Sequence, residues 1–213
     1  GSYDGSISNA VWVTSGAPSG GSALQFDGTG DEVNAGNVPV GSAGGAAGGF
    51  TASFWAKAGT QIRNNPVLLS KSNGGDSQRS FRVDRYKIGG KLRFTVYMDG
   101  TNGKTVITPQ QVLVEDTWQH IAVTFDGTFQ RIYVNGQQVA QSAEREGDFT
   151  TARNSELFIA SNGEGAAYKA NQFVGEMDDV RLYSRALTHV EIEAIMQREL
   201  LASYTFEEGA GST

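Results

Sequence analysis

The chain has 213 residues, no cysteine and a formal net charge of −6. The lack of cysteine excludes a disulfide framework, thiol catalysis and thiolate-bound metal. The acidic balance argues against nucleic acid as the main partner, and no apolar run is long enough to insert into a membrane. The nearest thing to a basic patch is Arg79, Arg82, Arg85 and Lys87. We interpret it as a solvated surface, because Arg79 and Arg85 would share one face of a strand and Arg82 would take the other.

Short apolar segments separated by turn residues run along the chain. Hydrophobic residues make up 38% of it, enough for a core, and 28 glycines against 4 prolines indicate many tight turns. Val134-Asn-Gly136 predicts a two-residue hairpin turn. We expect one all-β domain, an antiparallel β-sandwich or jelly roll with one short C-terminal helix. Residues 6–13 alternate roughly between apolar and polar side chains. Phe50, Phe54 and Ala56 are expected to share one face of a strand. The expected strands are 23–26, 50–56, 66–70, 81–86, 92–98, 121–125, 131–134, 156–160 and 173–183.

The last expected strand carries two adjacent carboxylates, Asp178 and Asp179. Such a pair costs free energy in a packed strand unless it is paired or bound to a cation. Further on, Thr188-His-Val-Glu191 fits a capping box, in which the Thr188 hydroxyl accepts from the N3 amide while Glu191 reaches back to the cap. A short helix is expected next, with Ile192, Ile195, Met196 and Leu200 on one face.

Four stretches, in order, give the chain a family resemblance. They are Ala23-Leu-Gln-Phe-Asp-Gly28, Phe50-Thr-Ala-Ser-Phe-Trp-Ala-Lys57, Trp118-Gln-His-Ile-Ala-Val-Thr-Phe-Asp-Gly127 and the acidic strand from Val174. With them the chain resembles a laminin-G-like domain of the concanavalin-A-like lectin/glucanase superfamily, in the form common in bacterial secreted proteins. The resemblance implies a β-sandwich, a secreted or cell-surface location, and core positions for Trp55 and Trp118.

The resemblance also implies that the family's opening strand is displaced. Segment 201–213 resembles that strand but stands last in this chain, and 201–209 would fold back into the domain. One interpretation is circular permutation, in which 1–200 form the sandwich and 201–213 complete it. The other is that 201–213 begin the next repeat of a tandem array. We expect the first, and a monomer, because an unpaired strand leaves an open sheet edge; pairing with a neighbour would instead give a strand-swapped assembly.

A structural calcium ion is a further implication of the resemblance. Family members often hold a cation between the aspartate after the Phe, here Asp27, and the acidic pair of the last strand. Asp27-Gly28-Thr-Gly-Asp31 places two carboxylates on a glycine-rich turn, and calcium prefers such oxygen ligands. The alternative is that these aspartates cap turns and pair with Arg181 or Arg185. The expected calcium ligands are Asp27, Asp31, Asp178 and Asp179.

Catalysis is not expected, although one motif suggests it. Glu176-Met-Asp-Asp-Val-Arg181 is similar to the E-x-D-x-x-E signature of glucanases, in which alternate carboxylates act as nucleophile and acid/base. Glu176 and Asp178 would share a face. The acid/base position is Arg181, however, so the leaving group would have no proton donor. His120 is expected to be a core or edge residue, and no nucleophile elbow or phosphate loop is present.

Ligand binding through polar loops is the function that remains. The loop 161–171 directly precedes the acidic strand, so its polar groups could converge near the metal. We expect a non-catalytic, calcium-supported adhesion module that binds a glycan or cell-surface polysaccharide. The alternative is a structural spacer or assembly repeat with no small ligand. The expected ligand-binding residues are Tyr86, Asn162, Glu164, Tyr168 and Asn171.

Overall fold

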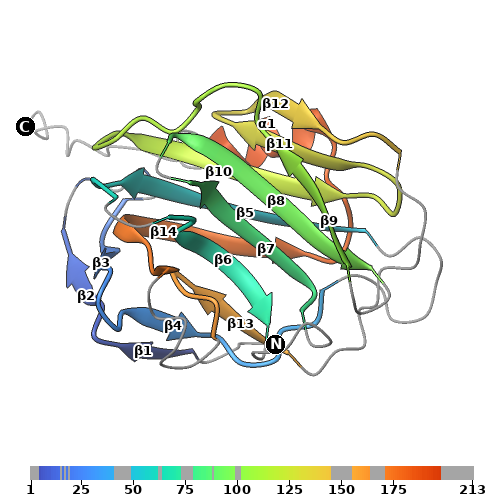
Figure 1. Ribbon diagram of the computed structural model, residues 1–213. Coiled ribbons are helices and arrows are strands. Elements are labelled where there is room, and N and C mark those ends of the chain that lie inside the picture. The colour runs from blue at the N-terminus through green and yellow to red at the C-terminus, as the bar shows by residue number, and fades with distance from the viewer. Residues whose placement is uncertain are drawn as a thin grey trace, which may run out of the picture.

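The computed structural model describes residues 5–14, 16, 18, 20–40, 49–61, 64–72, 79–87, 89–98, 102–144, 155–163 and 171–197. Within them two antiparallel sheets pack face to face as a sandwich, which confirms the predicted fold class (Figure 1). In spatial order, sheet A consists of β1 (Ser6–Ser8), β4 (Glu32–Asn34), β13 (Glu156–Ile159), β6 (Val67–Ser72), β7 (Phe81–Tyr86), β8 (Lys91–Met98) and β9 (Asn102–Ile107). Sheet B consists of β12 (Gln137–Gln141), β11 (Gln130–Val134), β10 (Trp118–Phe125), β5 (Phe50–Ala58), β14 (Val174–Tyr183), β3 (Ala23–Asp27) and β2 (Val11–Val13).

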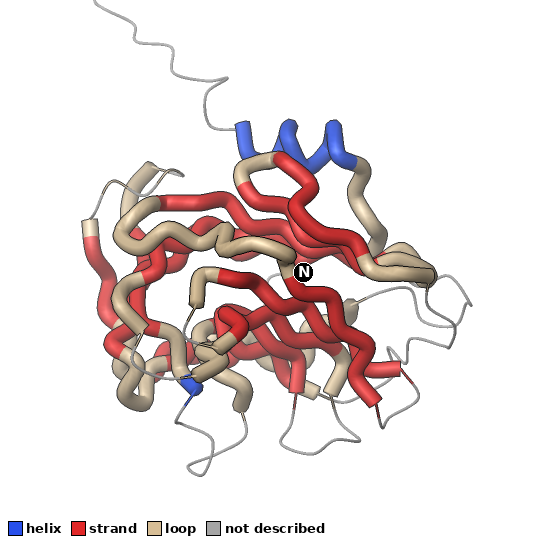
Figure 2. The backbone as a smooth tube through the Cα atoms, turned by 45° about the horizontal axis from the view of Figure 1, so that its top comes forward, coloured by secondary structure: helices blue, strands red, loops and turns tan. Residues whose placement is uncertain are grey.

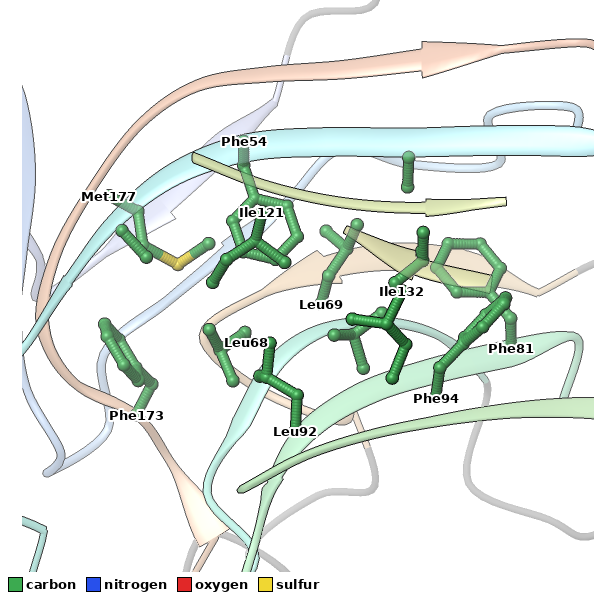
Figure 3. Packing of buried hydrophobic residues seen from close by; sticks show 14 of the residues in the cluster. Phe54, Leu68, Leu69, Phe81, Leu92, Phe94, Ile121, Ile132, Phe173 and Met177 are labelled. Atoms are coloured by element: carbon green, nitrogen blue, oxygen red, sulfur yellow. The ribbon is translucent and has the colours of Figure 1, made fainter. Parts of the chain in front are cut away.

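Strand β5 lies at the centre of sheet B, paired with β10 on one side and β14 on the other. Its side chains alternate between the core and the outer face, as in any strand. Phe50, Phe54 and Ala56 all point into the core and are buried, which confirms that they share a face. Aliphatic and aromatic side chains from both sheets fill the space between them (Figure 3).

Two predicted local motifs are confirmed. The turn between β11 and β12 has Asn135 at φ 49° and Gly136 at φ 80°, the positive values that a type I′ hairpin requires. Helix α1 (His189–Gln197) begins with the capping box: the Thr188 amide donates to Glu191 Oε2 at 2.8 Å, and the Glu191 amide lies 3.4 Å from Thr188 Oγ1. The helix covers one region of sheet B, and Ile192 is its buried residue (Figure 2).

The two adjacent aspartates of β14 lie at a β-bulge. Asp178 pairs with Trp55 and Arg181 with Ser53, so three residue steps on β14 match two on β5. Asp179 takes up the extra residue with φ 49°, a left-handed conformation that aspartate tolerates better than most residues. The backbone of the strand therefore accounts for an aspartate at position 179.

The predicted displaced strand at 201–209, and with it the division into 1–200 and 201–213, lies outside the described residues. In the part of the chain that the structure describes, no helix is long and apolar enough to cross a membrane.

Candidate functional site

Outward side chains from five strands of sheet B form one row. Partners directly opposite in a sheet share a face, so the register defines the row. Val11 on β2 lies opposite Gln25 on β3, which lies opposite Glu176 on β14. Glu176 lies opposite Lys57 on β5, and Lys57 lies opposite Trp118 on β10. The Lys57 ammonium donates to Glu176 Oε1 at 3.1 Å and fixes the centre of the row.

A groove of about 470 Å³ lies over most of this row, a volume typical of small-ligand sites. Its lining contains four carboxylates, two side-chain amides and one ammonium group. Such groups donate to and accept from hydroxyls, so the groove suits a ligand with many hydroxyl groups. The polar lining side chains are Asn9, Gln25, Asp27, Asp31, Lys57, Asp116 and Glu176.

The turn after β3 forms one wall of the groove, and local hydrogen bonds hold it. The Thr29 amide donates to Asp27 Oδ1 at 2.7 Å, and the Asp27 amide donates to the Asp31 carboxylate. Asp31 is buried, and burial raises the pKa of its carboxyl above the usual value, with the charge of Asp27 acting in the same direction and the Asp27 amide opposing. Both carboxylates therefore act as turn caps, as the alternative interpretation of the sequence holds.

The predicted set of four calcium ligands is not brought together. Asp27 pairs with Val174, so Asp178 lies four residues further along β14, roughly 13 Å away. Asp179 instead accepts from Arg181 Nε at 2.5 Å, one of the two arginine pairings that the alternative named. Only Asp27 and Asp31 lie together. Among the described residues, no three carboxylates or histidines form a group able to hold a metal ion.

The outer face of sheet B beside the row carries His120, which lies opposite Trp55 with ring centroids 5.4 Å apart. His120 is buried, as predicted, and burial with the charge of Arg181 lowers its pKa to about 4. It is therefore neutral near pH 7. Glu176 and Asp178 share the outer face, also as predicted, because their partners Lys57 and Trp55 are both outward.

Of the predicted ligand-binding residues, the structure describes Tyr86, Asn162 and Asn171, and these three lie in different places. Tyr86 ends β7 of sheet A, and Asn162, in the segment after β13, lines a small hollow beside β6 and β7. Asn171 is half-buried just before β14. Glu164 and Tyr168 lie outside the described residues.

The sequence interpretation did not place the outward residues of sheet B, and it did not find Gln172. Trp55 and Trp118 are half-buried on the outer face of sheet B, not in the core, because they alternate with the core residues of their strands. The same alternation, applied to 23–27 and 50–58, would have placed Gln25 and Lys57 outward. Gln172 left no such signal: it accepts from the Gly30 amide at 2.6 Å and donates to the Asp31 carbonyl at 2.9 Å, across about 140 residues.

Comparison with known proteins agrees with the observed fold. A family model described as "Concanavalin A-like lectin/glucanases superfamily", Laminin_G_3, matches residues 27–193. Pappalysin-1 of Mus musculus is 31% identical over 104 residues, and that of Homo sapiens is 30% identical over the same length. These matches cover 49% of this chain but only 6% of each relative, so the chain spans a small part of the curated relatives that it matches.

Solved structures with the same fold are distant in sequence. The binding domain of Paraclostridial Mosquitocidal Protein 1 superposes with a TM-score of 0.67 at 15% identity, covering 93% of this chain and 48% of that one. Domain 4 of AbnA, an extracellular arabinanase of Geobacillus stearothermophilus solved with arabinotriose, superposes with a TM-score of 0.65 at 15% identity. The match covers 91% of this chain and 88% of that one. The ligand-binding domain of botulinum neurotoxin serotype D, solved with N-acetylneuraminic acid, superposes with a TM-score of 0.63 at 14% identity. The match covers 93% of this chain and 47% of that one.

Proposed function

Because the chain belongs to the Laminin_G_3 family of the concanavalin A-like lectin/glucanase superfamily, we propose that it is a non-catalytic carbohydrate-binding module whose ligand lies in the sheet B groove. The row of outward residues from Val11 to Trp118 carries this proposal, because Gln25, Glu176 and Lys57 line the groove with polar groups and Trp118 continues the row beside Lys57, just beyond the lining.

Each part of the row has a role that suits a saccharide. Glu176 accepts from sugar hydroxyls, Gln25 both accepts and donates, and Lys57 donates while its pairing with Glu176 keeps both groups in place. Trp118 offers an indole next to Lys57 for stacking against a sugar ring. The ligands named for two fold neighbours, arabinotriose and N-acetylneuraminic acid, support the same ligand class.

A non-catalytic role is supported by the residues of the acidic strand. Glycoside hydrolysis needs a carboxylic acid to protonate the leaving group. Position 181 carries arginine, Asp179 is paired with it, and Glu176 is paired with Lys57. The fold neighbours described above include two domains named for binding, in keeping with this role. We propose in addition that the module acts in adhesion from a secreted or surface protein.

Calcium is a separate prediction. Asp27 and Asp31, together with carbonyl oxygens of their turn, are the residues that would hold an ion, but their carboxylates already accept from backbone amides. Binding in the groove as proposed uses no metal. A chelator therefore tests the calcium prediction without deciding the glycan proposal.

The test is a glycan array probed with the purified chain, with calcium and with a chelator. The wild type is expected to retain a defined set of glycans, and Gln25→Ala and Glu176→Gln are expected to weaken retention about tenfold or more. Gln137→Ala, an exposed glutamine on β12, is the matched control and should leave retention unchanged. Retention that is equal in all four proteins would refute the groove as the site.

An assembly unit is the second candidate, and exposed apolar side chains favour it. Ile7 on β1 and Val11 and Trp12 on β2 are 42%, 54% and 65% exposed, on the edge strands of both sheets. Open edges with apolar side chains invite pairing with another chain. A blank array together with concentration-dependent oligomers, abolished by Trp12→Lys, would support this role over glycan binding.

A further inference from the structure

The outer face of sheet A carries a second polar surface, made by β7, β8 and the residues beside them. Phe81 and Val83 of β7 point into the core, so Arg82, Asp84 and Tyr86 point outward. Their partners on β8 complete the surface, which we call the arginine face. The outward residues of β8 are Lys91, Arg93, Thr95 and Tyr97.

A buried carboxylate holds two arginines of this face in place. Asp84 has no exposed surface, and it accepts from Arg93 Nε and Nη2 at 2.8 and 2.7 Å. Arg82 Nε lies 2.5 Å from the same carboxylate, and Arg82 Nη2 donates to the Asn65 carbonyl at 3.0 Å. Nη1 of each arginine has no acceptor in the described part of the chain. Two fixed guanidinium groups around one carboxylate leave a net positive charge with a free donor on each arginine.

Aromatic rings lie at both ends of the arginine face. Lys87 Nζ and Arg93 Cζ each lie 5.3 Å from the centre of the Tyr86 ring. Arg79 Cζ lies 5.7 Å from the centre of the Tyr97 ring. Tyr86 pairs with Lys91, six residues before Tyr97 on β8, so the two tyrosine positions are roughly 20 Å apart along the strands. A surface of this length fits a stretch of polymer better than a single small molecule.

The charge of this face is opposite to that of the protein. Among the described residues of β7, β8 and their flanking turns, five cations accompany the single outward carboxylate of Asp84. Glu156 lies on β13, which is two strands away from β7 in sheet A. The face is thus positive although the whole chain has a net charge of −6. The sequence interpretation missed this cluster, because Arg85 points to the core side while Arg79 lies over Tyr97 beside Arg82. The five cations are Arg79, Arg82, Lys87, Lys91 and Arg93.

We propose that the arginine face binds an acidic polysaccharide. Carboxylate or sulfate groups along the polymer would accept from Arg82 and Arg93, whose guanidinium planes suit such anions. The sugar rings between them would pack on Tyr86 and Tyr97. This site lies on the opposite sheet from the groove and stands independently of the function proposed for it.

The test measures retention of the chain on immobilised polygalacturonate, which offers carboxylates, and on heparin, which offers sulfates. A variant with Arg79→Gln, Lys87→Gln and Lys91→Gln removes three charges and leaves the contacts of Asp84 with Arg82 and Arg93 in place. Its matched control removes three charges elsewhere through Lys104→Gln, Arg131→Gln and Arg185→Gln. A second variant, Tyr86→Ala with Tyr97→Ala, tests stacking at constant charge.

Salt-sensitive binding to at least one acidic polymer is expected, weakened about tenfold or more in the first variant and in the tyrosine variant but not in the control. The better-bound polymer identifies carboxylate or sulfate as the preferred anion. Glu176→Gln should leave this binding unchanged, which separates the two sites. The proposal is refuted if neither polymer binds or if the control variant loses as much. Equal binding of single-stranded DNA with the same sensitivity to the variants would also overturn it, in favour of unselective charge attraction.

Discussion

A buried ammonium group makes the stability of this sandwich depend on alkaline pH. Lys71 on β6 points to the core side, as its partner Phe81 does, and is 1% exposed. Its Nζ donates to Asn37 Oδ1 at 2.9 Å and to the Ser155 carbonyl, both neutral acceptors. Burial lowers the pKa of Lys71 from 10.5 to about 8, against the opposing charge of Glu156.

The direction of the effect follows from proton linkage. The unfolded chain keeps the Lys71 proton up to pH 10.5, whereas the folded chain begins to release it near pH 8. The unfolded state therefore binds more protons in this window, and the free energy of unfolding rises with pH across it. A difference of this size corresponds to about 3 kcal/mol in all. Below the window the full destabilisation by the buried charge is present.

Guanidinium unfolding of wild type and Lys71→Met, at pH values spanning the window, measures the effect as a difference between the two proteins. Groups common to both cancel, and the loss of the Asn37 bond shifts the whole curve without changing its slope. Lys104→Met, which removes an exposed lysine, is the control and should follow the wild type. If wild type and Lys71→Met change in parallel from pH 8 to 10.5, Lys71 is not charged and buried in the way described.

Two further predictions concern other positions in the fold. The pKa of His120 is lowered to about 4 by burial and by the charge of Arg181, so the folded chain binds fewer protons than the unfolded chain from pH 6.5 down to about 4. Wild type should lose about 3 kcal/mol relative to His120→Asn over that range, and equal acid profiles in urea unfolding would contradict this. Gly136→Ala should destabilise the chain by about 1 kcal/mol, because φ is 80° and a Cβ would lie 3.2 Å from Glu193; an unchanged melting temperature would contradict it.

The sequence was sufficient to predict the sandwich because turn chemistry and alternation are local. Asn135 and Gly136 determine their hairpin by backbone preference, and Thr188 with Glu191 determines the start of the helix within four residues. Neither motif needs a distant partner to form. The bulge at Asp179 escaped this reasoning, since a single extra residue changes the register of β14 against β5 without any break in the apolar pattern.

The candidate sites were harder to predict because each one is assembled by register between distant strands. Gln25, Glu176 and Lys57 are far apart in the sequence, and only the pairing of β3, β14 and β5 makes them neighbours. The four predicted calcium ligands are separated for the same reason, since Asp27 pairs with Val174, four residues before Asp178 on β14. The arginine face needed Arg93 of the neighbouring strand, which the sequence interpretation of Arg82 did not include.

Strand β5 shows how one strand can serve both the core and the proposed binding groove. Its inward residues, such as Phe54, are fully buried and leave no room for change without cost to the core. Two of its outward residues have different roles: Thr51 holds the segment before the helix by accepting from the Leu187 amide at 2.8 Å, and Lys57 holds Glu176 in the groove. Substitution of Lys57 would therefore alter the proposed groove site while the core side keeps the strand in place. The same separation holds for β7, where Val83 faces the core and Arg82 lies on the arginine face, so the two proposed binding faces can vary independently of each other and of the core.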